Sequence, residues 1–191
     1  MSSAVRIRQA FETIRRQDFL PPAQRGFAAE DRALHIGHRQ TNSQPSTVYT
    51  MLELLEVEPG QRILDLGCGS GWTTALLGAL VGPTGQVYGV EIVAELVEWG
   101  RANLATYPMP WTSITSAAGD HLGLPDQAPF DRILVSAEAQ SLPHALVDQL
   151  VVDGVLVIPV DGRMTVVRRA EGGPSVVHHG FYSFVPLIEP V

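Results

Sequence analysis

Lysine is missing from this 191-residue chain, whose thirteen basic residues are all arginines. Mechanisms that need a lysine Schiff base or a phosphate-loop lysine are therefore excluded. Cysteine is almost missing as well: with Cys68 alone, no intrachain disulfide can form, which is typical of a protein from a reducing compartment. Long apolar runs are also missing, since none approaches the roughly 18 residues of a membrane span.

The sequence shows neither a secretion signal nor a strongly basic segment. Charged side chains interrupt the apolar positions of the first 19 residues, whereas a signal peptide needs a continuous apolar segment there. The formal net charge is −7, whereas a surface that binds nucleic-acid phosphates needs clustered cations. We expect a soluble, cytoplasmic protein that binds neither nucleic acid nor membrane.

Helical and strand patterns alternate along the chain. Apolar residues recur at helical spacing in residues 4–18 and again after Pro45, while residues 24–44 are polar and loop-like. We also predict strands at 62–66, 86–91, 112–117, 131–136 and 155–159, and helices at 72–80, 93–104 and 143–150. Such alternation is typical of an α/β fold with a mostly parallel sheet, here ending in an antiparallel hairpin of residues 164–169 and 176–184.

A glycine-rich loop directly follows the first of these strands. Its sequence is Gly67-Cys68-Gly69-Ser70-Gly71-Trp72. A dinucleotide-binding fingerprint would have its third glycine at residue 72, so the pattern argues against NAD. Glu91 ends the next strand, 20 residues after Gly71, where a carboxylate can accept hydrogen bonds from both ribose hydroxyls. The pattern favours a different adenosine-containing cofactor, and a plain strand-to-helix turn is the weaker alternative.

Several segments, taken in order, resemble one known family. They are Leu20-Pro21-Pro22, Gln40-Thr41-Asn42-Ser43-Gln44-Pro45, Asp65-Leu66-Gly67-Cys68-Gly69-Ser70-Gly71, Ala128-Pro129-Phe130-Asp131, Ile158-Pro159-Val160 and Phe184-Val185-Pro186-Leu187. On these motifs the chain resembles the protein-L-isoaspartate (D-aspartate) O-methyltransferases. The resemblance implies a Rossmann-like fold that binds S-adenosyl-L-methionine. It also implies methyl transfer to the free α-carboxylate of L-isoaspartyl residues in damaged proteins or peptides.

The resemblance further implies a division of the chain and a set of site residues. We expect one methyltransferase domain, 1–191, with an acceptor-side helical segment at 1–57, a cofactor-binding core at 58–160 and a C-terminal hairpin at 161–191. By position Ser43 is the catalytic serine, and its structural alternative is a helix N-cap. The expected cofactor-binding residues are Thr41, Asn42, Gln44, Asp65, Gly67, Cys68, Gly69, Ser70, Gly71, Glu91, Ile92, Gly119, Asp120 and His121.

The sequence departs from the family pattern at several places, including His38-Arg39 and Ser136-Ala137-Glu138-Ala139. The loop after Gly119-Asp120 is one residue shorter and has His121 in place of a glycine. Asn42 replaces an apolar residue, and the family's C-terminal helix has no counterpart after Leu187. We expect the lid over the cofactor to be absent or supplied by a partner, in a monomer or homodimer. Two rival hypotheses stay open: a methyltransferase with a small-molecule, peptide or RNA acceptor, and a non-catalytic module that binds S-adenosylmethionine.

We expect no metal site in this chain. His35 and His38 are three residues apart but have no obvious third ligand, and the adjacent His178-His179 would point to opposite faces of a strand. The arginine pairs Arg15-Arg16 and Arg168-Arg169 are interpreted as solvated surface residues.

Overall fold

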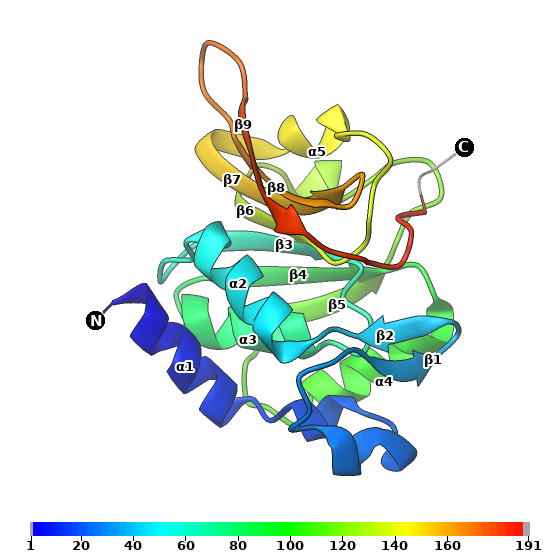
Figure 1. Ribbon diagram of the computed structural model, residues 1–191. Helices are drawn as coiled ribbons and strands as arrows, with labels where there is room; N and C mark the ends of the chain where they lie inside the picture. Colours follow the sequence, from blue (N-terminus) through cyan, green and yellow to red (C-terminus); the bar gives the residue numbers. More distant parts are fainter. Residues whose placement is uncertain (1, 189–191) are drawn as a thin grey trace.

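A seven-stranded sheet forms the centre of the computed structural model, which describes residues 2–188 (Figure 1). Its strands are β3 Arg62–Leu66, β4 Gln86–Glu91, β5 Thr112–Ser116, β6 Phe130–Val135, β7 Leu150–Val160, β8 Arg163–Arg168 and β9 Ser175–Phe181. The spatial order is β5-β4-β3-β6-β7-β8-β9, with parallel pairing from β5 to β7 and antiparallel pairing beyond. The α/β class, the mostly parallel sheet and the terminal hairpin are therefore confirmed.

Helices cover both faces of this sheet. They are α1 Ser3–Thr13, α2 Pro45–Leu55, α3 Trp72–Val81, α4 Ala94–Leu104 and α5 His144–Val147, with short 3-10 helices η1 Arg16–Phe19, η2 Pro22–Phe27 and η3 Pro125–Gln127. On β3, Ile63 packs in a core with side chains of α1 to α4, whereas its neighbour Leu64 packs in a second core with α5. Successive strand residues face opposite sides, so both can be buried. Among the described residues, no helix combines the length and apolar character needed to cross a bilayer.

Two helices are shorter than predicted. Helix α1 ends at Thr13 instead of near residue 18, because Ile14 is extended and its carbonyl accepts a hydrogen bond from the indole of Trp72 at 3.4 Å. The predicted helix at 143–150 is reduced to the four residues of α5, since the chain already joins the sheet at Leu150. In both cases a tertiary contact ends a helix that local periodicity would continue.

A small hairpin replaces part of the loop predicted at residues 24–44. Its strands are β1 Leu34–Gly37 and β2 Gln40–Asn42, which pair antiparallel beside α4 (Figure 1). Leu34 and Ile36 are buried and alternate with exposed neighbours. This short alternation is the signal that the sequence prediction missed.

Candidate active site

The glycine loop joins the end of β3 to the first turn of α3. Gly67, Gly69 and Gly71 have positive φ angles of 74°, 53° and 89°, which residues with side chains rarely adopt. A Cβ atom on Gly71 would also lie 3.0 Å from a methyl carbon of Ile114 and 3.2 Å from the carbonyl oxygen of Gly100. The loop therefore requires glycine for its shape as well as for close approach of a ligand.

Glu91 ends β4 beside this loop, and backbone N–H groups hold its carboxylate. One oxygen accepts from Gly69 at 2.8 Å, and the other accepts from Ile92 and Val93 at 2.8 and 2.9 Å. Each carboxylate oxygen can accept more than one hydrogen bond. Glu91 can therefore keep these contacts and still accept hydrogen bonds from a ligand.

A cavity of about 310 Å³, which we call the β4 cavity, lies beyond the end of β4. Glu91, Ile92, Gly119 and His121 line it, together with residues 185–188. The walls are mostly apolar and the polar groups are few, as in typical cofactor sites. In size and lining, this cavity suits an adenosine group whose ribose meets the carboxylate.

The C-terminal segment, residues 185–188, forms one wall of the β4 cavity. The N–H of Leu187 donates to the carbonyl of Glu138 at 2.7 Å, and the N–H of Glu138 donates to the carbonyl of Val185 at 2.8 Å. These backbone hydrogen bonds hold the segment beside the cavity. The chain itself therefore supplies this wall of the β4 cavity.

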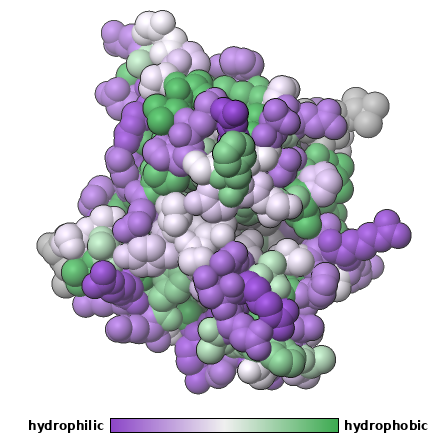
Figure 2. Space-filling view, viewed as in Figure 1, coloured by the Kyte–Doolittle hydropathy of each residue, from purple (hydrophilic) through white to green (hydrophobic). Residues whose placement is uncertain are grey.

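A second cavity, of about 620 Å³, opens between the start of α2 and the end of β9, and we call it the α2 cavity. Its hydroxyl-bearing lining residues are Thr41, Ser43, Ser46, Thr47, Thr50, Ser136, Tyr182 and Ser183. Figure 2 shows this part of the surface as mainly pale, the colour of residues with intermediate hydropathy. The cavity is thus polar without being strongly charged, and it can donate hydrogen bonds to an anionic group.

A small space of about 30 Å³, here called the junction, connects the two sets of lining residues. It shares Gly67 and Glu91 with the β4 cavity, and Ser43 and Ser136 with the α2 cavity. Val185 lines all three spaces. Ligands in the two larger cavities would therefore meet beside Ser43.

Ser43 is not the N-cap of α2. That position belongs to Gln44, which makes no side-chain cap, and the N–H of Ser46 donates to the carboxylate of Asp31 at 2.9 Å. The Gln44 amide donates to the same carboxylate at 3.0 Å. The hydrogen bond from the Gln44 side chain and then those from Ser46 lower the pKa of Asp31. The capping alternative for Ser43 is therefore wrong, and helix capping does not account for its hydroxyl.

Asp65 lies beneath the glycine loop and lines none of the three spaces. One oxygen accepts from the hydroxyls of Thr73 and Thr74 at 2.7 and 2.6 Å, while the other has no partner among the described residues. Complete burial raises the pKa of Asp65 to about 6, although the two threonine hydrogen bonds oppose this change. Its place in the structure is to support the first turn of α3.

The other predicted cofactor residues divide by whether they line a cavity. Those that line one are Thr41, Asn42, Gln44, Gly67, Cys68, Gly69, Ser70, Glu91, Ile92, Gly119 and His121. Gly71 precedes α3 and lines none of the three. Asp120 also lines none, and its exposed carboxylate lies 2.7 Å from the ring Nδ1 of His121.

Arg16 was predicted to lie on the solvated surface, and that prediction is wrong. Its side chain is buried and makes six hydrogen bonds, including two to Asn42 and one to the carbonyl of Ser43. The adjacent Arg15 is exposed and pairs with Asp18. Nothing in the local sequence distinguishes the two arginines, so only the folded chain reveals which of them reaches the site.

These observations define the class of protein. A Rossmann-like sheet carries a glycine loop after β3, an acidic residue at the end of β4 and an adenosine-sized cavity beside both. Trp72 occupies the position of the third glycine in the dinucleotide fingerprint. This is the arrangement of the S-adenosylmethionine-dependent methyltransferases.

Comparison with known proteins then identifies the family. The family model described as Protein-L-isoaspartate(D-aspartate) O-methyltransferase matches residues 1–190. The chain is 44% identical over 188 residues to the protein-L-isoaspartate O-methyltransferase of Aeropyrum pernix, covering 96% of this chain and 72% of that protein. It is 40% identical to the same enzyme of Gloeobacter violaceus, covering 93% and 87%. The chain belongs to the protein-L-isoaspartate(D-aspartate) O-methyltransferase family.

Two solved structures share the fold. A protein-L-isoaspartate O-methyltransferase aligns with a TM-score of 0.85 at 23% identity, covering 95% of this chain, which spans only 61% of the length of that chain. A structure from Plasmodium falciparum, assigned to the same enzyme and solved with S-adenosyl-L-homocysteine, aligns with a TM-score of 0.82 at 22% identity, covering 96% and 90%. Membership of the family makes this chain an S-adenosylmethionine-dependent methyltransferase of the protein-repair type.

Proposed function

We propose that the enzyme holds the α-carboxylate of an L-isoaspartyl residue in the α2 cavity and the adenosine of S-adenosylmethionine in the β4 cavity. The observation that carries this proposal is the position of Ser43, which lines both the α2 cavity and the junction. A carboxylate hydrogen-bonded to Ser43 would lie beside the glycine loop. The two reactants would then approach each other through the junction.

The residues of the β4 cavity suit the parts of this cofactor. Glu91 would accept hydrogen bonds from the ribose hydroxyls, and Ile92, which is 50% exposed, would pack against the adenine. The backbone at Gly67 and Gly69 would allow close approach of the methionine portion. When bound, the cofactor supplies an electrophilic methyl group on a sulfonium ion.

The reaction needs no strong base. An aspartyl-type carboxyl group with a reference pKa of about 3.9 is already ionised at neutral pH, so the nucleophile is ready-made. The hydroxyl of Ser43 would donate to one carboxylate oxygen and orient the other toward the methyl group. Alignment and exclusion of water can contribute up to roughly 7 to 11 kcal/mol in favourable models. Catalysis by this enzyme would therefore depend mainly on positioning.

The test is transfer of a labelled methyl group to an isoaspartyl peptide, with the matching aspartyl peptide as the control substrate. Selective transfer to the isoaspartyl peptide is expected. Equal transfer to both peptides would contradict the proposed acceptor. Calorimetry with S-adenosylmethionine on the same sample distinguishes a catalyst for another acceptor from a chain that fails to bind the cofactor.

A Ser43→Ala variant tests the assigned role of the serine. Loss of one well-placed donor is expected to lower kcat roughly 100-fold while cofactor affinity stays the same. Ser175→Ala, which changes an exposed serine at the start of β9, is the control and should leave both quantities unchanged. Unchanged kcat in Ser43→Ala would remove this residue from the mechanism.

A further inference from the structure

We propose that Arg16 and Asn42 are positioning residues that hold the acceptor-side loop, residues 41–44, against the glycine loop and thereby set the place of Ser43. The inference rests on the function proposed above for Ser43. Both side chains are buried; Arg16 lines none of the three spaces, and Asn42 lines only the junction.

Arg16 lies behind the acceptor-side loop with only 6% of its surface exposed. Its Nε donates to the side-chain oxygen of Asn42 at 2.8 Å, and its Nη2 donates to the carbonyls of Asn42 and Ser43 at 3.2 and 2.9 Å. Three further carbonyls accept from it at 3.3, 2.9 and 2.7 Å, those of Ala28, Glu30 and Arg32. One planar side chain thus fixes the loop relative to the segment before it.

The environment of Arg16 favours a positional role over a purely stabilising one. All six acceptors are carbonyl or amide oxygens, so no carboxylate pairs directly with the buried charge through these contacts. Burial lowers the pKa of Arg16 to about 10, which leaves it protonated at neutral pH. Burying this charge costs free energy, and the attraction of the nearby Asp31 carboxylate opposes only part of that cost, while the planar guanidinium fixes the directions of several hydrogen bonds at once. The ring of Trp72, 5.5 Å from the guanidinium carbon, offsets part of that cost.

Asn42 connects Arg16 to the glycine loop. Its oxygen accepts from Arg16, so its amide nitrogen faces the hydroxyl of Ser70, to which it donates at 3.4 Å. The carbonyl of Ser70 in turn accepts from the amide of Asn103 at 3.0 Å, which fixes the glycine loop from the side of α4. An apolar residue at position 42, as in the family pattern, could make neither side-chain hydrogen bond. The connection is therefore built by this chain's own departure from that pattern.

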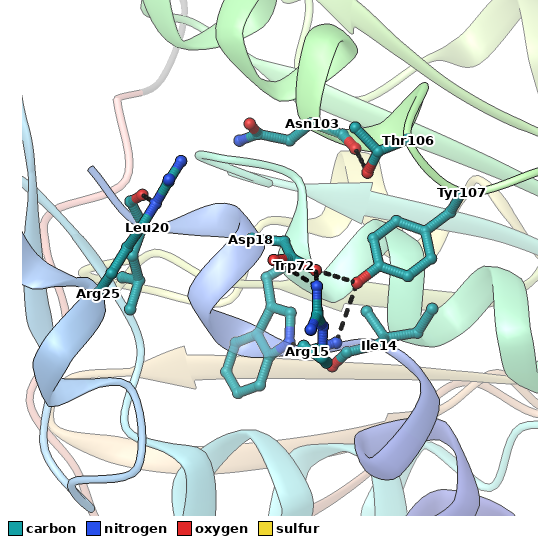
Figure 3. A network of polar contacts seen from close by, with 9 residues as sticks. All are labelled: Ile14, Arg15, Asp18, Leu20, Arg25, Trp72, Asn103, Thr106 and Tyr107. Atoms are coloured by element: carbon teal, nitrogen blue, oxygen red, sulfur yellow. Dashed lines mark hydrogen bonds and ion pairs between the residues drawn. The ribbon is translucent and has the colours of Figure 1, made fainter. Parts of the chain in front are cut away.

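The short helix η1, which carries Arg16, is itself anchored to the core (Figure 3). The hydroxyl of Tyr107 donates to the carboxylate of Asp18 at 2.8 Å and accepts from the N–H of Arg15 at 3.1 Å. Figure 3 shows these three side chains converging beside the loop that follows α4. Because Tyr107 binds residues on both sides of Arg16, the position of the guanidinium is fixed, and the acceptor-side loop that it binds is fixed with it.

The experiment compares Arg16→Lys with Arg15→Lys in the full-length enzyme. A lysine ammonium cannot serve six acceptors spread around a planar fork, so Arg16→Lys is expected to lower kcat for an isoaspartyl peptide at least tenfold. Affinity for S-adenosylmethionine should change less than twofold, because Arg16 lines neither larger cavity. The exposed Arg15 provides the matched control, and its variant should behave as the wild type. Equal kcat in the two variants, or a parallel loss of cofactor affinity, would overturn the proposal.

Asn42→Ile provides a second variant that keeps the test decisive if Arg16→Lys folds poorly. It removes both side-chain hydrogen bonds of residue 42 and is expected to lower kcat several-fold. Combined with Arg16→Lys, it should add little further loss, since both changes break one connection. Fully additive losses would contradict a shared role.

Hydrogen exchange gives a readout that does not depend on catalysis. Both variants are expected to speed amide exchange in residues 41–44 while exchange in residues 67–71 changes less. A wild type that transfers no methyl group would refute the proposed function, and the exchange result would still decide this inference. Unchanged exchange at 41–44 would show that Arg16 and Asn42 do not hold the loop.

Discussion

The glycine loop and the acceptor-side loop meet at the junction, but the chain builds them in different ways. Residues 67–71 owe their shape to three glycines with positive φ and to the N–H of Gly69, which donates to Glu91. Residues 41–44 are held by side chains that come from other segments, chiefly Arg16 and Asp31. A site shaped by its own backbone leaves a readable pattern in the sequence, whereas a site held by distant side chains does not.

The two loops also differ in the charge buried behind them. Burial raises the pKa of Asp65 to about 6 beneath the glycine loop and lowers the pKa of Arg16 to about 10 behind the acceptor-side loop. In each case the cause is loss of solvation of the charged form. Asp65 keeps one oxygen without a partner among the described residues, whereas Arg16 makes six hydrogen bonds. The buried charge behind the acceptor-side loop is therefore more completely hydrogen-bonded than the one beneath the glycine loop.

The largest effect is expected where backbone shape matters most. Gly71→Ala places a Cβ at positive φ and against the backbone of Gly100, so it should lower the free energy of unfolding by roughly 2 to 5 kcal/mol and abolish cofactor binding. Urea denaturation and calorimetry measure these quantities. Gly172→Ala, in an exposed turn with no atom within 4 Å of the new Cβ, is the control and should have little effect. If Gly71→Ala left both stability and cofactor binding unchanged, the glycine loop would not depend on its backbone shape, and the contrast with the acceptor-side loop would be wrong.

The pH dependence of stability tests the buried carboxylate. The pKa of Asp65 is raised from 3.8 to about 6, so the folded state favours the protonated form and loses stability as the pH rises between these values. Asp65→Asn removes the charge and keeps an acceptor for Thr73 and Thr74. The free energy of unfolding of the variant, relative to that of the wild type, should therefore rise on the order of 3 kcal/mol when the pH is raised from 4 to 7. Urea denaturation at both pH values measures this gain, and a difference that does not change with pH would contradict it.

A smaller effect, on cofactor binding, is expected at Glu91. Glu91→Gln replaces one acceptor oxygen by an NH₂ group that faces backbone donors, so cofactor affinity should fall roughly 10- to 100-fold. Titration calorimetry with S-adenosylmethionine measures the change. Glu95→Gln, on the exposed side of α4, should leave the affinity unchanged. Equal affinity in the two variants would mean that Glu91 accepts hydrogen bonds from backbone N–H groups only and does not bind the cofactor.

The smallest effect is expected at the start of α2. Asp31→Ala removes the acceptor for Gln44 and Ser46, so the acceptor-side loop should loosen and the KM for an isoaspartyl peptide should rise roughly two- to fivefold. Cofactor affinity should not change. Since these hydrogen bonds lower the pKa of Asp31, their contribution is present at neutral pH and is lost as the carboxylate becomes protonated in acid. Peptide kinetics measure the effect, and Glu53→Ala, exposed on the same helix, should match the wild type.

Sequence patterns located the cofactor side of the site closely. The strands predicted at 62–66 and 86–91 coincide with β3 and β4, because a short apolar run bounded by glycine or an acidic residue is a local signal. The same reasoning missed the hairpin before α2 and extended α1 too far. Those errors arise where a contact such as that of Trp72 with the carbonyl of Ile14 overrides local preference.

By itself, the sequence determined the α/β class, the order of most strands and helices, and the glycine loop with its acidic partner, because periodicity and glycine's freedom are properties of neighbouring residues. Only the tertiary structure decided that Arg16 is buried while Arg15 is exposed, and that Asp31 rather than Ser43 satisfies the first turn of α2. Those outcomes depend on contacts between segments far apart in the chain. Two adjacent arginines have the same local chemistry, and only packing distinguishes them.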